Sequence, residues 1–217
     1  MIEGIQLKVC GLTSLVDAGV ADECGADFLG FILYKKSPRH VSIAQFRSMI
    51  GRLPARHKVA VTVEPEPEEL LEMRDAGFDR FQVHFRHDLP VAKVEGWSKA
   101  VGARSLWLAP KLPPASDAAE AWFELSQAIV LDTFDANLFG GTGRTGDWGK
   151  FSRHRKAHPR RTWILSGGLK PENIQEALEE SGARFIDVNS GIESAPGVKD
   201  HARLKAFVQA VHKSARH

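Results

Sequence analysis

The sequence has few cysteines, little excess charge and no long apolar run. Only Cys10 and Cys24 occur among its 217 residues, so a disulfide framework or a structural metal site is not expected. The 29 basic and 27 acidic residues leave a formal net charge of +2, which gives no large field for nucleic acid or an anionic membrane. No apolar run approaches the roughly 18 residues of a membrane span, and no signal-peptide pattern begins the chain. These absences favour a cytoplasmic protein without nucleic-acid or membrane partners.

The chain instead shows short strand-like segments that alternate with helical patterns. We expect strands at 5–10, 26–33, 58–63, 80–84, 105–109, 128–132, 162–166 and 185–188. We expect helices at 14–25, 42–53, 67–76, 91–101, 117–125, 147–154, 171–180 and 200–213. Eight strand-helix units of about 27 residues each predict one α/β domain over 1–217, a (β/α)₈ TIM barrel. A doubly wound open sheet is the structural alternative.

A thiol stands at the end of the first predicted strand. Period two places Leu7 and Val9 on one face, and Gln6, Lys8 and Cys10 on the other. The carboxyl ends of barrel strands are where such enzymes hold their reactive groups. Cys10 is therefore either a small buried apolar side chain or a general base whose thiolate Lys8 favours.

Two aspartates end later strands on the same side of the predicted barrel. The first and eighth strands of a closed barrel are neighbours, so Asp187 is a candidate partner for Lys8. Asp132 ends the sixth strand, where it either caps a loop or serves as an acid opposite the base Cys10. His84 is expected to be a satisfied barrel residue, and with Cys10 and Asp132 it forms no familiar metal-ligand set.

Glycine-bearing loops follow the last three strands. The loop at 139–148 offers backbone N–H groups around Gly141 and Gly143, although it is not a Walker loop. Gly167-Gly168 and Ser190-Gly191 follow the seventh and eighth strands, the usual phosphate-binding position of such barrels. Taken alone, the loop at 139–148 is also explained as a flexible lid, and each of the other two loops is equally explained as a tight turn. Together with Arg39, whose planar fork suits an anion, they predict a phosphorylated small-molecule ligand.

These motifs, taken in order, resemble the phosphoribosylanthranilate isomerase family of tryptophan biosynthesis. The matching segments are 8–13 (KVCGLT), 36–42 (KSPRHVS), 131–133 (LDT), 140–148 (GGTGRTGDW), 165–173 (LSGGLKPEN), 187–193 (DVNSGIE) and 196–200 (PGVKD). The resemblance implies a cofactor-free barrel enzyme that performs an Amadori rearrangement of N-(5′-phosphoribosyl)anthranilate. It implies that Cys10 is the general base, that Asp132 is the general acid and that Arg39 faces the anthranilate carboxylate. A monomer and a homodimer both fit the sequence.

Three positions depart from the family pattern: Phe85 where Gly is usual, Glu64 where Asn is common, and Asn189 where Ser is usual. We expect Phe85 and Glu64 to lie near the barrel mouth and to affect the aromatic half of the pocket. Two rival functions remain at this stage. One is another ribulose-phosphate-binding barrel isomerase, and the other is a non-catalytic barrel that binds a phosphorylated ligand.

Overall fold

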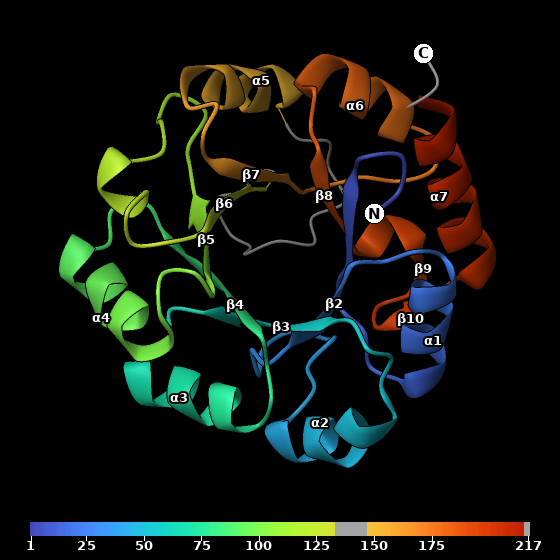
Figure 1. The fold of residues 1–217 in the computed structure, drawn as a ribbon, viewed down its shortest axis with the longest axis horizontal. Coiled ribbons are helices and arrows are strands. Elements are labelled where there is room, and N and C mark those ends of the chain that lie inside the picture. Colours follow the sequence, from blue (N-terminus) through green and yellow to red (C-terminus); the bar gives the residue numbers. More distant parts are fainter. Residues whose placement is uncertain (133–146, 215–217) are drawn as a thin grey trace.

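Eight parallel strands close into a barrel, with helices around its outside (Figure 1). The computed structural model describes residues 1–132 and 147–214. The strands of the barrel are β1 (Gln6–Val9), β2 (Phe28–Ile32), β3 (His57–Val63), β4 (Arg80–Arg86), β5 (Leu106–Lys111), β6 (Ala128–Leu131), β7 (Thr162–Leu165) and β8 (Phe185–Val188). Because β1 pairs with both β2 and β8, the predicted barrel is confirmed and the open sheet is excluded.

The described helices cover the barrel, and capping side chains begin several of them. They are α1 (Leu15–Glu23), α2 (Ile43–Met49), α3 (Pro67–Asp75), α4 (Val91–Val101), α5 (Trp148–Ala157), α6 (Ile174–Ser181) and α7 (His201–Ser214). Ser14 accepts a hydrogen bond from the Asp17 amide at the start of α1, and Ser42 forms a capping box with Gln45 at the start of α2. Pro67 occupies the first turn of α3, where no amide hydrogen is needed.

The helix predicted at 117–125 is wrong. Only a single 3₁₀ turn, η2 (Glu120–Trp122), forms there. The segment before it is fixed onto α5 instead: the Ala118 amide donates to His154 Nε2 at 3.2 Å, and Lys150 Nζ donates to the Pro113 carbonyl oxygen at 2.7 Å. Contacts with α5 thus replace the local hydrogen bonds of a helix, which no local sequence pattern reveals.

A small hairpin follows β8 and was not expected. After the 3₁₀ turn η3 (Ser190–Ile192), β9 (Glu193–Ala195) pairs antiparallel with β10 (Val198–Lys199) before α7 begins. In Figure 1 the hairpin lies beside α1, at the edge of the barrel. It brings two charged residues, Glu193 and Lys199, next to Arg39 and Asn189, which line the cavity described below.

Alternate side chains of each strand separate two cores. Leu7 and Val9 pack outward with the helices, whereas Cys10 belongs to the interior cluster, as period two predicts. At the amino-terminal end of the barrel, the rings of Phe28, Trp107 and Phe185 contact one another and fill the interior. The floor is therefore aromatic, and space remains only toward the carboxyl ends of the strands.

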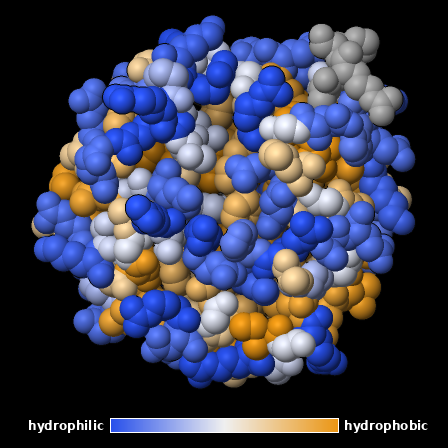
Figure 2. Space-filling view, in the orientation of Figure 1, coloured by the Kyte–Doolittle hydropathy of each residue, from blue (hydrophilic) through white to orange (hydrophobic). Residues whose placement is uncertain are grey.

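The outer surface is mostly hydrophilic on the face seen in Figure 2, with small apolar patches between charged side chains. Among the described residues, no helix combines the length and the apolar character needed to cross a membrane.

We predict that Gly77→Ala destabilises the barrel. Gly77 follows α3 with φ +102°, and an added Cβ would lie 2.4 Å from Ile50 Cδ1. Backbone strain and overpacking together should lower the free energy of unfolding by about 1–3 kcal/mol. Urea denaturation followed by far-UV circular dichroism measures the change.

Gly19→Ala is the matched control. Gly19 lies inside α1, and an added Cβ would meet nothing within 4 Å. Because alanine favours a helix interior by about 0.5–1 kcal/mol over glycine, this variant should be slightly more stable than the wild type. Equal effects of both substitutions would contradict the explanation from backbone angle and space.

Candidate active site

A cavity of about 570 Å³ opens at the carboxyl ends of the strands. This volume suits a small ligand, and the position is the usual one for barrel enzymes. The cavity brings together seven of the residues predicted from the sequence, which are Cys10, Arg39, Asp132, Gly167, Gly168, Asp187 and Ser190. Gly141 and Gly143, also predicted to bind phosphate, lie outside the described residues.

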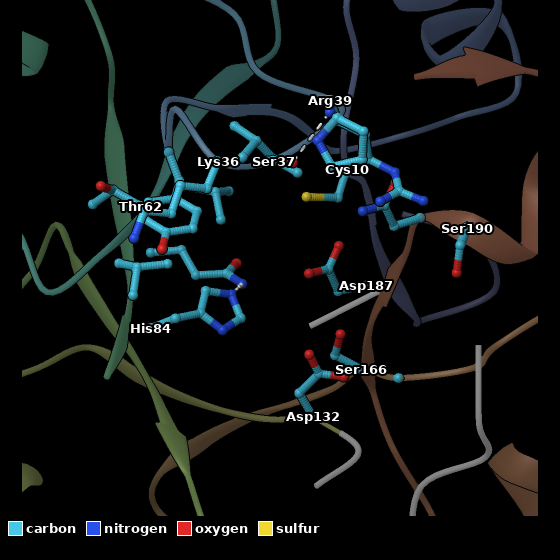
Figure 3. A pocket seen from close by; sticks show the side chains of 18 of the residues that line it. Cys10, Lys36, Ser37, Arg39, Thr62, His84, Asp132, Ser166, Asp187 and Ser190 are labelled. Carbon is cyan, nitrogen blue, oxygen red and sulfur yellow. Dashed lines mark hydrogen bonds between the residues drawn. The ribbon is translucent and has the colours of Figure 1, made fainter. Parts of the chain in front are cut away.

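The two side chains predicted to act as base and acid come from different strands. Cys10 follows β1 and Asp132 follows β6, and both line the cavity. In Figure 3, Cys10 and Arg39 lie on one side of the cavity, Asp132 and Ser166 lie on the opposite side, and Asp187 is seen between them. The cavity thus presents a thiol and a carboxyl group from opposing walls.

Lys8 and Asp187 form a buried ion pair under the cavity, as the strand order predicted. The two residues are register partners across β1 and β8, and Lys8 Nζ donates to Asp187 Oδ2 at 2.7 Å. The Lys8 side chain is 0% exposed and that of Asp187 4%. Burial alone lowers the pKa of Lys8, but Asp187 and Cys10 more than offset this effect and hold the pKa above its ordinary value. Lys8 therefore stays charged although it is fully enclosed.

The second oxygen of Asp187 has no hydrogen-bond partner among the described residues. Asp187 lines the cavity, and its Oδ1 atom is buried without a hydrogen bond to any described residue. Burial raises the pKa of the Asp187 carboxyl above its ordinary value, and Lys8, Lys199 and the Gln82 amide oppose this only in part. A buried carboxylate oxygen with spare acceptor capacity is suited to a donor on a ligand.

Gly30 makes room for this pair and was not identified from the sequence. A Cβ atom there would lie 2.9 Å from Lys8 Cε and 3.1 Å from Cys10 Sγ. The available signal was one glycine inside the apolar strand β2, which marks a close approach by a neighbouring chain. Any larger residue would displace the lysine or the thiol.

Burial decides the protonation state of Cys10. Desolvation raises the pKa of the thiol, and Asp187 raises it further, while Lys8 and Lys199 lower it. The net pKa is above the ordinary value. The expected effect of Lys8 on the thiolate is therefore present but is outweighed by desolvation.

His84 lines the cavity as a neutral imidazole. Burial, assisted by the positive charge of Lys8, lowers its pKa to about 4. Its Nε2 atom lies 3.0 Å from Gln82 Nε2, so the ring accepts a hydrogen bond from the amide. This agrees with the expected barrel residue that has a hydrogen-bond partner.

The loops after β7 and β8 pack tightly against each other. Gly167 and Gly168 have φ values of +92° and +63°, which turn the chain back toward the cavity. Gly191 does not line the cavity, but a Cβ there would come 1.9 Å from the Leu169 carbonyl oxygen. Glycine is required at these positions to bring backbone amides of both loops to one end of the cavity.

The expectation for Phe85 and Glu64 is corrected. Phe85 is fully buried on the helix side of β4, in contact with the rings of Trp97 and Trp122. Glu64 accepts a hydrogen bond from the Arg86 amide at 2.9 Å. Neither side chain lines the cavity. Phe85 points to the helix side because consecutive residues of a strand point to opposite faces and His84 already points inward.

Two charged residues of the hairpin were missed. Glu193 forms an ion pair with Arg39 at 2.7 Å, and Lys199 pairs with Glu193 at 2.9 Å. Lys199 Nζ also donates to Asn189 Oδ1 at 2.9 Å, so the unusual Asn189 belongs to this network. The contacts link β9, β10 and the loop after β2. Within residues 1–132 and 147–214, no cluster of three His, Cys, Asp or Glu side chains is arranged to hold a metal ion.

Comparisons with known proteins agree on one family. A family model described as N-(5′-phosphoribosyl)anthranilate (PRA) isomerase matches residues 7–210. An N-(5′-phosphoribosyl)anthranilate isomerase of Pseudomonas fluorescens (strain Pf0-1) is 35% identical over 213 residues, covering 97% of this chain and 100% of the relative.

Solved structures show the same similarity. The phosphoribosyl anthranilate isomerase of Thermus thermophilus matches with a TM-score of 0.79 and 31% identity, covering 96% of this chain and 99% of that one. A phosphoribosyl anthranilate isomerase in complex with reduced 1-(o-carboxyphenylamino)-1-deoxyribulose 5-phosphate matches with a TM-score of 0.78 and 31% identity, covering 96% and 98%.

The electrostatics of Cys10 predict its reactivity in the free protein. In a Cys24→Ser background, the rate of alkylation by iodoacetamide should still be rising at pH 9, because burial raises the pKa of the Cys10 thiol above its ordinary value of 9.0. Mass spectrometry of the labelled peptide measures the rate. The variant Cys10→Ser, in the same background, corrects for labelling elsewhere. A plateau below about pH 8 would contradict the protonated thiol.

Proposed function

The chain belongs to the N-(5′-phosphoribosyl)anthranilate isomerase family, and we propose that Cys10 and Asp132 perform the chemistry of that family in this protein. The enzyme isomerises N-(5′-phosphoribosyl)anthranilate, an aldose-to-ketose conversion of tryptophan biosynthesis. The observation that carries the residue assignment is the cavity itself, in which a thiol from β1 and a carboxyl group from β6 face each other. A barrel that only binds a ligand needs neither group.

The reaction needs one acid and one base. Asp132 gives its proton to the ring oxygen of the ribose while the C1′–O bond breaks and the nitrogen lone pair forms an iminium ion. The Cys10 thiolate then removes the proton from C2′, and the electron pair moves into a C1′=C2′ bond to give an enolamine. Tautomerisation transfers a proton to C1′ and leaves the ketone at C2′. No bond to the protein forms, and no redox change of a cofactor is required.

In this proposal Cys10 and Asp132 together hold one proton, and catalysis depends on which of the two groups carries it. The reactive arrangement has the proton on Asp132 and none on Cys10, whereas burial favours the protonated thiol. Both arrangements carry the same net charge. The charges of Lys8 and Lys199 increase the thiolate fraction. Lys8 is in this proposal an electrostatic support for the base.

The remaining residues bind the ends of the substrate. We assign the carboxylate of the anthranilate ring to Arg39 and the phosphate to the loops at Gly167-Gly168 and Ser190-Gly191. The free Oδ1 atom of Asp187 accepts a hydrogen bond from a substrate donor and stabilises the cationic iminium. Gly141 and Gly143 are assigned to the same phosphate site on the sequence pattern alone. The free thiols and a biosynthetic role favour a cytoplasmic location.

Removal of either reacting group should abolish most turnover. Cys10→Ser and Asp132→Asn should each lower kcat by about 10²–10⁴-fold, because each removes one proton-transfer group from the reaction. The decrease of anthranilate-type fluorescence, with freshly made phosphoribosylanthranilate, measures the rate. Product binding, measured by calorimetry, should persist in both variants.

Cys24→Ser is the control, because Cys24 lies outside the cavity and should leave kcat unchanged. An unchanged rate in Cys10→Ser or Asp132→Asn would remove that residue from the mechanism. A wild-type protein without turnover would favour the non-catalytic barrel, and turnover of a different aminosugar phosphate alone would favour the related isomerases.

Substitutions in the ion pair under the cavity should distinguish its effect on stability from its effect on the catalytic rate. Lys8→Met leaves Asp187 buried without its cation and should lower the free energy of unfolding by about 3–5 kcal/mol. The double variant Lys8→Met/Asp187→Leu removes both charges and should recover most of that loss. Its kcat should nevertheless stay low, because the support for the thiolate and the acceptor for the substrate are both gone. A double variant with wild-type kcat, measured by the same fluorescence assay, would refute a role for the pair in catalysis.

A further inference from the structure

The guanidinium of Arg39 is held on one edge before any ligand is present. Its Nε atom donates to Glu193 Oε1 at 2.9 Å and to Oε2 at 3.0 Å, and its Nη2 atom donates to Oε2 at 2.7 Å. The Nη1 atom makes no hydrogen bond to any described residue. Because the guanidinium is planar, fixing the Nε–Nη2 edge also fixes the direction of Nη1. One edge of the group is thus occupied, and Nη1 remains available.

Glu193 is itself held in place by the hairpin. Lys199 Nζ donates to Glu193 Oε1 at 2.9 Å, and the Gly197 amide donates to the same oxygen at 3.2 Å. Lys199 and Glu193 are register partners between β10 and β9. Lys199 is anchored in turn by Asn189, whose Oδ1 and backbone oxygen accept at 2.9 and 3.3 Å. The Glu193 carboxylate thus accepts hydrogen bonds from Arg39, Lys199 and Gly197, and together these hold it in one orientation.

The cluster of Arg39, Glu193 and Lys199 contains one more positive than negative charge. Arg39 and Lys199 provide two cations against the single carboxylate of Glu193, and the side chains of Lys199 and Glu193 are only 0% and 4% exposed. Burial alone raises the pKa of Glu193, but Arg39 and Lys199 more than offset this and hold its pKa below the ordinary range. Burial lowers the pKa of Lys199, which Glu193 opposes only in part. An anion placed against the free edge of Arg39 would balance the charge.

We propose that Glu193, held by Lys199, is a positioning residue that presents the Nη1 side of Arg39 to a ligand carboxylate and thereby makes the site selective for carboxylated substrates. The proposal rests on the assignment of the anthranilate carboxylate to Arg39. It adds that the selectivity depends on the hairpin β9–β10, whose residues do not line the cavity themselves. A fixed guanidinium loses less freedom on binding than a flexible one, so the gain appears in affinity.

The test compares two ligands that differ only in the carboxylate. They are 1-(2-carboxyphenylamino)-1-deoxyribulose 5-phosphate and the corresponding phenylamino compound, and their dissociation constants are measured by calorimetry. Glu193→Gln should reduce the preference for the carboxylated ligand by about tenfold or more, since charge-assisted hydrogen bonds are misplaced. Affinity for the phenylamino compound and for inorganic phosphate should change by less than about twofold. In turnover assays KM should rise more than kcat falls.

Two further variants control for misfolding and for nonspecific effects of removing a carboxylate. Glu193→Gln/Lys199→Met removes the lysine that would otherwise stay buried without its carboxylate, and it should show the same loss of preference while keeping a cooperative thermal transition. Glu172→Gln is the matched control, because Glu172 pairs with Arg203 at 3.2 Å with its side chain 55% exposed and lies outside the cavity. This control should bind both ligands like the wild type.

Arg39→Met separates the two levels of the argument. If this variant keeps the carboxylate preference, the assignment of Arg39 to the substrate fails. If Arg39→Met loses the preference but both Glu193 variants retain it, Arg39 binds the carboxylate and the positioning role of Glu193 is overturned. Tighter binding of the carboxylated ligand by Glu193→Gln would also overturn the proposal, because Glu193 would then compete with the ligand for Arg39.

Discussion

The buried ion pair between Lys8 and Asp187 is the interaction on which the cavity depends. It joins the first and last strands of the barrel, so the closure of the sheet and the placement of charge occur at the same point. Neither charge could stay in the barrel without the other, because an isolated buried ion costs several kcal/mol. Gly30 provides the space through which the lysine reaches its partner. Barrel closure thereby fixes the surroundings of Cys10.

Much of this arrangement follows from the sequence, because strand period and barrel closure are simple geometric rules. Period two places Lys8 and Cys10 inward, and the neighbouring positions of the first and eighth strands pair Lys8 with Asp187. The same rule places Phe85 on the helix side, because His84 faces inward. The prediction for Phe85 was wrong because it relied on the position near the end of the strand and did not apply this alternation. The local sequence pattern is sufficient to predict side-chain direction wherever the backbone forms a regular strand.

Contacts between distant segments lie beyond such rules. Glu193 and Arg39 are 154 residues apart in the chain, and their pairing depends on a two-residue strand that has no clear pattern of its own. The segment before η2 likewise has helix-favouring residues, yet its backbone bonds to His154 of α5. In both cases long-range hydrogen bonds outweigh local propensity, and only the folded chain shows them. Side chains that position a ligand-binding group are therefore the hardest part of a site to predict.

The charged residues in these contacts also affect the proton affinity of the Cys10 thiol. Lys8 is paired with Asp187, and Arg39 and Lys199 are paired with Glu193. In Figure 3, Arg39 lies on the side of Cys10, whereas Asp132 comes from the opposing wall. An anionic ligand group bound by Arg39 would balance the charge of the cluster formed by Arg39, Glu193 and Lys199. Lys8 and Lys199 lower the pKa of the Cys10 thiol, which is the direction that the base of an acid-base pair needs. Burial alone works against the thiolate, so the catalytic use of Cys10 depends on the cations that the barrel and its hairpin place beside it.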